Sequence, residues 1–598
     1  MSFSQLKLEN HSCKLTCTFS KQGPTASELC ARLCHLWATR PGAEWSNVEL
    51  PKVFLPLPRG SKVLWMAQED PAIATDGDGN SQTKALAALL NLKMTRDDID
   101  CEIADMLDKL QTTLYARSPP VAVSSAQAIG RLFHRGVGRH KEAIRNACLS
   151  SLRAVMESDD VATATAAANT FACVLQSTTN GQLKDLVNDG AVIKMAGLLV
   201  ALPFGDHVTA APIIRRLLQR CSTEEKRQLC NDDMLLHLKT LLQSEWIDST
   251  CDAAASIAEL ATAAEVEQAK AIIDADLLRC LVELTRLRGT EAVFEAVDAI
   301  GCILDVTTAQ QRATLPFEDI LSCLVDLLSR PETGDATINS AVVAIGSLAE
   351  NSSEAEKSRF LEGSTMILLK ELLSNEDVSG EAAYAIGCIA EGASEHQKQT
   401  ILQSGLLTPL KSLLQASDST TAKNAIDVVF YLGPSVEAVK QILEAGIAAA
   451  LIEQLKSSEA VIEALNALLS IVESADDAAK RSLHNLRLTD RLLRALESPE
   501  ETTARLAAIL LSELSSTANP EDLELFAEAL DNFYERSAQA AASASQNGQP
   551  FLAECTSSGL ATAAAFEVGD SRDARAKRNR TMRKRKLPDT ALSTALKK

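Results

Sequence analysis

The chain has 598 residues, of which 46% are apolar, 23% charged and 4% aromatic, a balance that favours a folded helical protein over a sheet-rich one. No apolar run approaches the ~20 residues that span a membrane, and the first seven residues lack the apolar core of a signal peptide, which argues against secretion. The 15 cysteines are scattered, and many lie in apolar helical stretches. Such thiols are typical of a reducing compartment, so we expect an intracellular protein.

Residues 1–80 form a non-repetitive N-terminal region. Segments 6–9 and 13–19 alternate apolar and polar residues as strands do. Residues 24–37 have the pattern of a capped amphipathic helix. This order predicts a small α+β module ahead of the rest of the chain.

Two patterns in this region resemble metal-binding motifs but depart from them. Two cysteine pairs have C-x3-C spacing, whereas a zinc knuckle uses C-x2-C. Residues 76–80 begin like a calcium loop, but Ser81 and Ala87 stand where that loop needs Gly and Glu. We therefore expect no metal and no cofactor.

From residue 81 to residue 518 a pattern of about 42 residues recurs, with a small or acidic residue ahead of an apolar stretch every 41–44 residues. These positions are Gly190, Asp233, Asp276, Asp319, Gly363, Gly405, Gly446 and Asp490, with weaker members at Asp105 and Ala147. Each unit contains a short leucine-rich helix, a longer apolar helix and a third short helix. Glycine closes several units in the left-handed conformation common at helix ends. Where Asp or Ala stands instead, we expect a cap of different construction.

Residues 385–395 read Ala-Ile-Gly-Cys-Ile-Ala-Glu-Gly-Ala-Ser-Glu, and residues 401–414 read Ile-Leu-Gln-Ser-Gly-Leu-Leu-Thr-Pro-Leu-Lys-Ser-Leu-Leu. This segment closely resembles the repeat of the armadillo family, which includes importin-alpha and beta-catenin, and the resemblance extends over about residues 85–515. It implies an all-α, right-handed superhelical solenoid of about ten three-helix units around one continuous core. In this family the third helix of each unit lines a groove that holds other proteins.

The groove positions implied by the resemblance carry charges of both signs and two tyrosines. Early units offer Arg131, Arg215 and Arg216. Later units offer acids and aromatic anchors: Glu259, Asp298, Glu350, Tyr384, Glu391, Asp427 and Tyr431. The set predicts a non-catalytic interaction scaffold that binds an extended partner segment with basic and apolar groups.

Importin-alpha repeats carry a Trp on the groove helix and an Asn one turn later, and these pairs clamp basic import signals. Here the Trp position holds Gln127, Thr170, Pro212, Ala255, Asp298, Val343, Tyr384, Asp427 and Asn466. The Asn position holds Arg131, Val174, Arg216, Glu259, Cys302, Ser347, Cys388, Tyr431 and Ser470. Because neither expected residue occurs in its column, a divergent nuclear-transport adaptor is the second interpretation. A third is an armadillo co-chaperone of Hsp70.

Nothing in the sequence predicts an enzyme. The motifs of hydrolases, phosphate-binding loops and zinc proteases do not occur. The 8 histidines are dispersed and pair with no nucleophile in the sequence.

The C-terminal part begins with a predicted capping helix over 519–544, with Pro520 in its first turn. Residues 545–598 are Ala/Ser-rich and then basic, a composition typical of disorder. Between residues 572 and 586 nine Lys or Arg stand against one acid, a charge of +8, so that the rest of the chain carries −28. An acidic body argues against nucleic-acid binding through phosphates.

The basic run is a predicted nuclear localisation signal for an import receptor, which places the protein in cytoplasm and nucleus. Its residues are Lys577, Arg578, Arg580, Arg583, Lys584, Arg585 and Lys586. The uneven charge also raises the hypothesis that this tail folds back into the acidic half of the groove.

Overall fold

The computed structural model describes residues 4–10, 13–19, 107–108, 110–136, 138–201, 207–287, 291–350, 352–433, 435–456 and 459–546. The chain divides into two compact units, Met1–Ala201 and Leu202–Lys598, which are taken separately below. The predicted helix over 24–37, the segment 76–80 and the weak repeat position Asp105 lie outside the described residues. So does the predicted disordered tail with its localisation signal, apart from residues 545 and 546.

The first unit begins with the strand pair that the alternation predicts. Strands β1 (Ser4–Asn10) and β2 (Cys13–Phe19) are antiparallel, and their register runs from Ser4 opposite Phe19 to Asn10 opposite Cys13.

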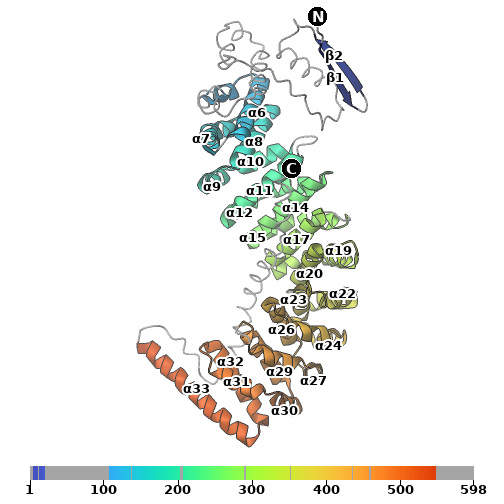
Figure 1. Cartoon of the computed structure of the whole chain (residues 1–598), viewed down its shortest axis with the longest axis vertical. Coiled ribbons are helices and arrows are strands. Elements are labelled where there is room, and N and C mark those ends of the chain that lie inside the picture. Colours follow the sequence, from blue (N-terminus) through green and yellow to red (C-terminus); the bar gives the residue numbers. More distant parts are fainter. Residues whose placement is uncertain are drawn as a thin grey trace. The chain divides into compact units, whose positions relative to one another are not determined.

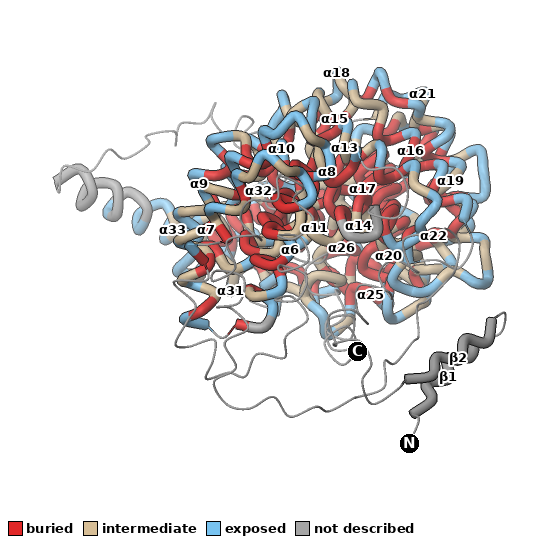
Figure 2. The backbone as a smooth tube through the Cα atoms, turned by 90° about the horizontal axis from the view of Figure 1, so that it is seen from above, coloured by how far each residue is buried: buried red, intermediate tan, exposed pale blue. Residues whose placement is uncertain are grey.

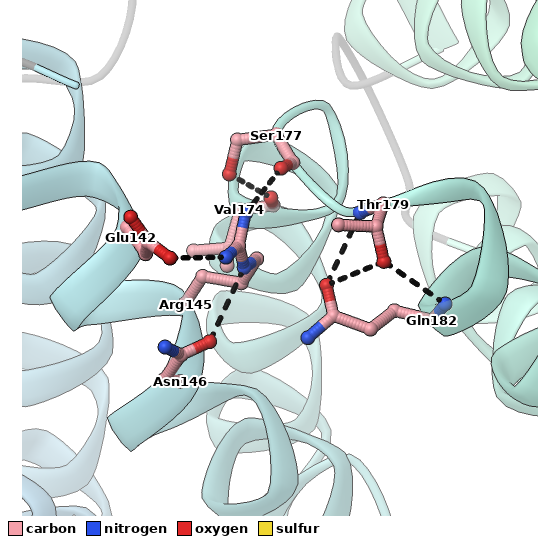
Figure 3. Close-up of polar contacts among 7 residues, drawn as sticks. All are labelled: Glu142, Arg145, Asn146, Val174, Ser177, Thr179 and Gln182. Atoms are coloured by element: carbon pink, nitrogen blue, oxygen red, sulfur yellow. Dashed lines mark hydrogen bonds and ion pairs between the residues drawn. The ribbon is translucent and has the colours of Figure 1, made fainter. Parts of the chain in front are cut away.

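From residue 119 onward, the described helices of the first unit are α6 (Pro119–Arg135), α7 (Gly138–Val155), α8 (Val161–Leu175), α9 (Asn180–Asn188) and α10 (Ala191–Val200). Helix α8 packs against α6, α7 and α10. Figure 3 shows how polar contacts hold the connection after α8: the Arg145 guanidinium on α7 donates to the Ser177 carbonyl at 2.7 Å. Thr179 and Gln182 then form the capping box that starts α9.

In the second unit the long helices recur at every third element. They are α11 (His207–Arg220), α14 (Ile247–Ala261), α17 (Glu291–Val306), α20 (Asp335–Ala349), α23 (Ser379–Ala390), α26 (Ser419–Leu432), α29 (Val461–Ser474) and α32 (Glu501–Leu514). Each packs against the next, so that α14 to α32 follow one another in Figure 1. This succession is consistent with an α-solenoid, as the sequence pattern predicts.

Other helices, most of them shorter, fill the positions between the long ones. They are α12 (Thr223–Leu229), α13 (Asp232–Leu242), α15 (Val266–Asp274), α16 (Leu277–Leu284), α18 (Ala309–Arg312), α19 (Phe317–Ser329), α21 (Glu354–Glu362), α22 (Thr365–Leu372), α24 (Glu395–Gln403), α25 (Leu407–Leu413), α27 (Val436–Glu444), α28 (Ile447–Gln454), α30 (Asp477–Asn485) and α31 (Leu488–Leu496). The 3-10 turn η1 (Ser515–Thr517) precedes α33 (Pro520–Gln546), which begins at the predicted proline and packs on α31 and α32. Among the described helices, none combines the length and apolar character needed to cross a membrane.

The core of the second unit runs through its long helices, where buried residues gather (red in Figure 2). All 12 residues of α23 are buried, between α20 and α26 on its two sides and α22, α24 and α25 beside it. A helix buried all round needs mostly small or apolar residues, which α23 supplies apart from Glu381 and Tyr384. Among the described cysteines, those in apolar stretches are buried or half-buried, as predicted.

Left-handed residues close several units. Three of the predicted closing glycines adopt this conformation: Gly190, Gly405 and Gly446. Asp276 and Arg487 adopt it as well, with φ of 59° and 60°. The expectation of a differently built cap at Asp276 is therefore wrong, because its carboxylate accepts from Arg279 at 3.0 Å and so offsets the unfavourable backbone. The predicted junction at Asp490 lies three residues late, inside α31, since Arg487 makes the turn.

Replacing Gly405 with Ala is expected to lower the free energy of unfolding by about 1–2 kcal/mol, because an L-residue is strained in the left-handed region. Its φ is 79°, and an added Cβ would also lie 3.6 Å from the Lys370 ammonium. Gly181→Ala is the matched control: it lies within α9 with no atom within 4 Å of the added Cβ, so it should be neutral or stabilising. Urea midpoints of both variants measure the difference, and equal midpoints would contradict the reasoning.

Cations link successive units at the carboxyl ends of the long helices. Arg227 on α12 donates to the carbonyl of Ala263 after α14 at 2.9 Å, and Lys357 on α21 reaches the carbonyl of Cys388 on α23 at 3.5 Å. Lys480 on α30 donates to the Glu513 carbonyl on α32 at 3.2 Å. The last carbonyls of a helix have no partner within it and carry the negative end of its dipole. A cation from one unit therefore caps the long helix of the next.

Candidate functional site

Most of the predicted groove residues lie on the long helices, which come second and not third in each unit as the sequence pattern divides it. Arg131 is exposed on α6 of the first unit, and Arg216 is exposed on α11 of the second. The acids of the second unit and Tyr431 are half-buried on or at the end of the next long helices: Glu259 on α14, Asp298 on α17, Glu350 after α20, Glu391 after α23, Asp427 and Tyr431 on α26. Because each of these helices packs on the next, the second-unit residues follow one another across five units.

Tyr384 is not part of an exposed face, so its prediction as an aromatic anchor is wrong. Its side chain is 3% exposed, and burial raises the pKa of its hydroxyl well above the ordinary value. The ring lies against Gly346 of α20, where a Cβ on that glycine would overlap Cε1 and stand 2.8 Å from Cδ1. The absence of a side chain at Gly346 lets α20 and α23 approach closely, and Tyr384 fills their interface.

Arg215 joins three consecutive long helices. Its guanidinium lies 3.0 Å from Asp252 Oδ1 on α14 and 2.7 Å from Glu295 Oε1 on α17. The three side chains are 24%, 19% and 8% exposed, so these charge pairs are screened less than surface pairs. With Cys251 and Glu291 beside them, we call these residues the Arg215 cluster.

The sequence reading included Arg215 but missed its partners. Asp252 and Glu295 stand three residues before Ala255 and Asp298, which occupy the position where importin-alpha repeats carry Trp. Residues three apart share a helix face, so this spacing was the available signal.

The Arg215 cluster contains three carboxyl groups and one guanidinium, so its acids outnumber its cation. Burial raises the pKa of Glu295 to about 7, and the neighbouring Asp298 and Glu291 add to the rise against the opposing effect of Arg215. Burial opposes the charge on Arg215, but Glu295 and Asp252 outweigh it and raise the guanidinium pKa. Arg215 therefore stays charged while Glu295 takes up a proton near neutral pH.

Two of the predicted acids face cations of the chain itself. Glu259 pairs with Lys226 on α12. The Glu350 backbone carbonyl accepts from Arg312, which is 7% exposed and also donates to the Leu304 carbonyl at 2.6 Å. Burial lowers the pKa of the Arg312 guanidinium, and the Glu350 carboxylate partly offsets that effect. These acids contribute to the connections between units as well as to the surface.

Tyr431 remains an aromatic group at the surface of α26. It is half-buried, and its ring packs edge-on against Phe430 with centroids 5.1 Å apart. On the same helix, the Lys423 ammonium pairs with Glu463 on α29 at 3.0 Å. The described face therefore combines half-buried acids with one accessible aromatic ring.

No family model and no curated protein matches the chain. Among solved structures, the crystal structure of an engineered protein from a structural-genomics consortium is similar, with a TM-score of 0.59 and 23% sequence identity. The match covers 69% of this chain and 100% of that one. The likeness is one of fold alone. It agrees with the stacked helical array described above.

Proposed function

We propose that this chain is a non-catalytic interaction scaffold of the armadillo type, with its units in a right-handed superhelix, that binds an extended basic segment along its long helices. One observation carries the proposal: a half-buried acid lies on, or directly after, each of five consecutive long helices, within two turns of the same helix position. These are Glu259, Asp298, Glu350, Glu391 and Asp427, which we call the acidic strip. Half-buried charges attract an opposite charge more strongly than fully solvated ones do.

The spacing of the acidic strip suggests the pattern of the partner. Packed helices lie about 8–10 Å apart, and an extended chain advances about 3.3 Å per residue. One basic residue at roughly every third position would therefore meet one acid per unit. Tyr431 would supply an aromatic contact beside Asp427.

Replacing Glu391 with Gln and Asp427 with Asn together is expected to weaken binding of a Lys-x-x-Lys-x-x-Lys peptide about tenfold. Each partly buried charge pair contributes on the order of 0.5–1 kcal/mol. The control variant, Glu376→Gln with Glu444→Gln, removes the same charge at two exposed acids away from the strip. Fluorescence anisotropy at two ionic strengths measures both, and the difference between the variants should shrink at high salt.

Equal weakening by the two variants would mean that only net charge attracts the peptide, and the proposal would fail. Deleting residues 570–598 should raise peptide affinity if the basic tail competes for the strip. Tight binding of importin-beta, of an import-signal peptide or of Hsp70, with no response to the strip variants, would favour the transport or co-chaperone interpretation instead.

A further inference from the structure

A thiol and two carboxylates converge between α14 and α17. Cys251 comes from α14, and Glu291 and Glu295 come from α17, where they stand one turn apart on the same face. The sulfur and one oxygen of each carboxylate all lie within 4.8 Å of one another. Within the described part of the chain, this is the one group of three or more His, Cys, Asp or Glu side chains with that proximity.

The Cys251 thiol is oriented toward these carboxylates and buried. It is 7% exposed and forms no hydrogen bond in the described structure. The thiols of Cys230 and Cys323, by contrast, donate to backbone carbonyls of Gln268 and Ile320, at 3.9 and 3.1 Å. A buried thiol that lies close to two carboxylates, with no hydrogen bond to either, is the arrangement of a metal ligand.

The charge around the thiol also favours a cation. Asp252 and Glu295 pair with the single guanidinium of Arg215, and the carboxylates of Glu291 and Asp298 lie near Glu295. Burying several carboxylates with one cation is unfavourable unless a proton or a further cation compensates them. Arg215 bonds Oε1 of Glu295, which leaves Oε2 available, and Glu291 is exposed and provides access from solvent.

We propose that Cys251, Glu291 and Glu295 form a binding site for a divalent cation of the zinc class, with water in the fourth position. Thiolate and carboxylate together suit Zn²⁺, whereas Mg²⁺ and Ca²⁺ prefer oxygen alone. Zinc bonds of about 2.3 Å to sulfur and 2.0–2.2 Å to oxygen require the three side chains to close by roughly 1 Å. On binding, the Cys251 S–H bond is replaced by the S–metal bond and its proton passes to solvent, so affinity should rise with pH.

The test uses the full chain with Cys13, Cys17, Cys30 and Cys34 replaced by Ser, which removes the other closely spaced thiols. Titration with Cd²⁺ should give a sulfur-to-metal charge-transfer band that saturates at one equivalent and is reversed by Zn²⁺ but not by Mg²⁺. Cys251→Ser should abolish the band, and Glu291→Gln should weaken affinity at least about tenfold.

Matched controls separate metal binding from general effects. Cys148→Ser changes another buried thiol, and Glu283→Gln changes another exposed acid. Both should leave the titration unchanged. The proposal is overturned if no thiolate band forms at one equivalent of Cd²⁺, or if Cys251→Ser retains it. Should Cys251→Ser lose its helical circular dichroism, the exposed Glu291→Gln variant decides, and an unchanged affinity there overturns the site.

Discussion

Gly346→Ala is expected to destabilise the second unit by about 2–3 kcal/mol, although alanine favours a helix more than glycine does. The added Cβ would overlap Cε1 of Tyr384 and stand 2.8 Å from its Cδ1 and 3.2 Å from the Cα of Ala385. Tyr384 is 3% exposed and Ala385 fully buried, so neither can move aside without opening the α20–α23 interface. Overpacking of this kind typically costs about 1–3 kcal/mol and occasionally more.

Gly387→Ala provides the matched control in the next long helix. An added Cβ there would stand 3.7 Å from Cγ2 of Val428, which is ordinary van der Waals contact. It should therefore keep or raise the urea midpoint. In a Tyr384→Leu background Gly346→Ala should cost much less, since the two positions share one contact. If Gly346→Ala behaves like Gly387→Ala, the close approach of α20 and α23 is not present in solution.

The contribution of Glu295 to the free energy of unfolding should fall as pH rises from about 4.5 to about 7, because folding raises the pKa of its carboxyl. Burial raises its pKa from 4.5 to about 7, so in this window the folded state binds more protons than the unfolded state. The stabilisation is complete below the unfolded pKa and is lost as pH passes the folded pKa. The slope is at most about 1.4 kcal/mol per pH unit, or roughly 3 kcal/mol across the window.

Glu295→Gln removes this titration while keeping a side chain that can accept from Arg215. The difference in unfolding free energy between wild type and variant should change between pH 5 and pH 7 and level off above pH 7. Denaturation curves in the presence of a metal chelator measure it without interference from bound cations. Glu444→Gln, an exposed acid on α27, is the control. A difference that stays constant with pH would show that Glu295 does not titrate in this window.

The sequence pattern predicted the helical array because the repeat is carried by many residues at once. The interval of 41–44 residues places each long helix, and the strand alternation and Pro520 place elements at both ends. Exposure of single side chains could not be predicted in this way. Tyr384 stands at a position that the repeat assigns to the groove. Whether its side chain is exposed there depends on how closely the neighbouring helix approaches. Gly346, 38 residues earlier, decides this.

The Arg215 cluster could not be predicted from the sequence for a different reason. Its charge pairs join residues 37 and 80 positions apart, so no local pattern links them. The family resemblance points to two positions on each groove helix, the Trp and Asn positions, and neither Asp252 nor Glu295 occupies one of them. A search of every acid one turn from a column position would have found both.

Each cation that caps a long helix connects one unit to the next, so the array is held together by contacts between neighbouring units. A basic residue stands four positions after the N-cap in several of the preceding short helices: Lys226, Arg312, Lys357, Lys398 and Lys480. Ala269 and Val439 occupy that position in α15 and α27. When units are stabilised mainly by their neighbours, the weakest coupling determines where the array opens. The boundary entering α17 is held instead by the pairs of Arg215 with Asp252 and Glu295. The boundary entering α29 is therefore the seam along which segments of this protein would separate first, leaving intact blocks of units on either side.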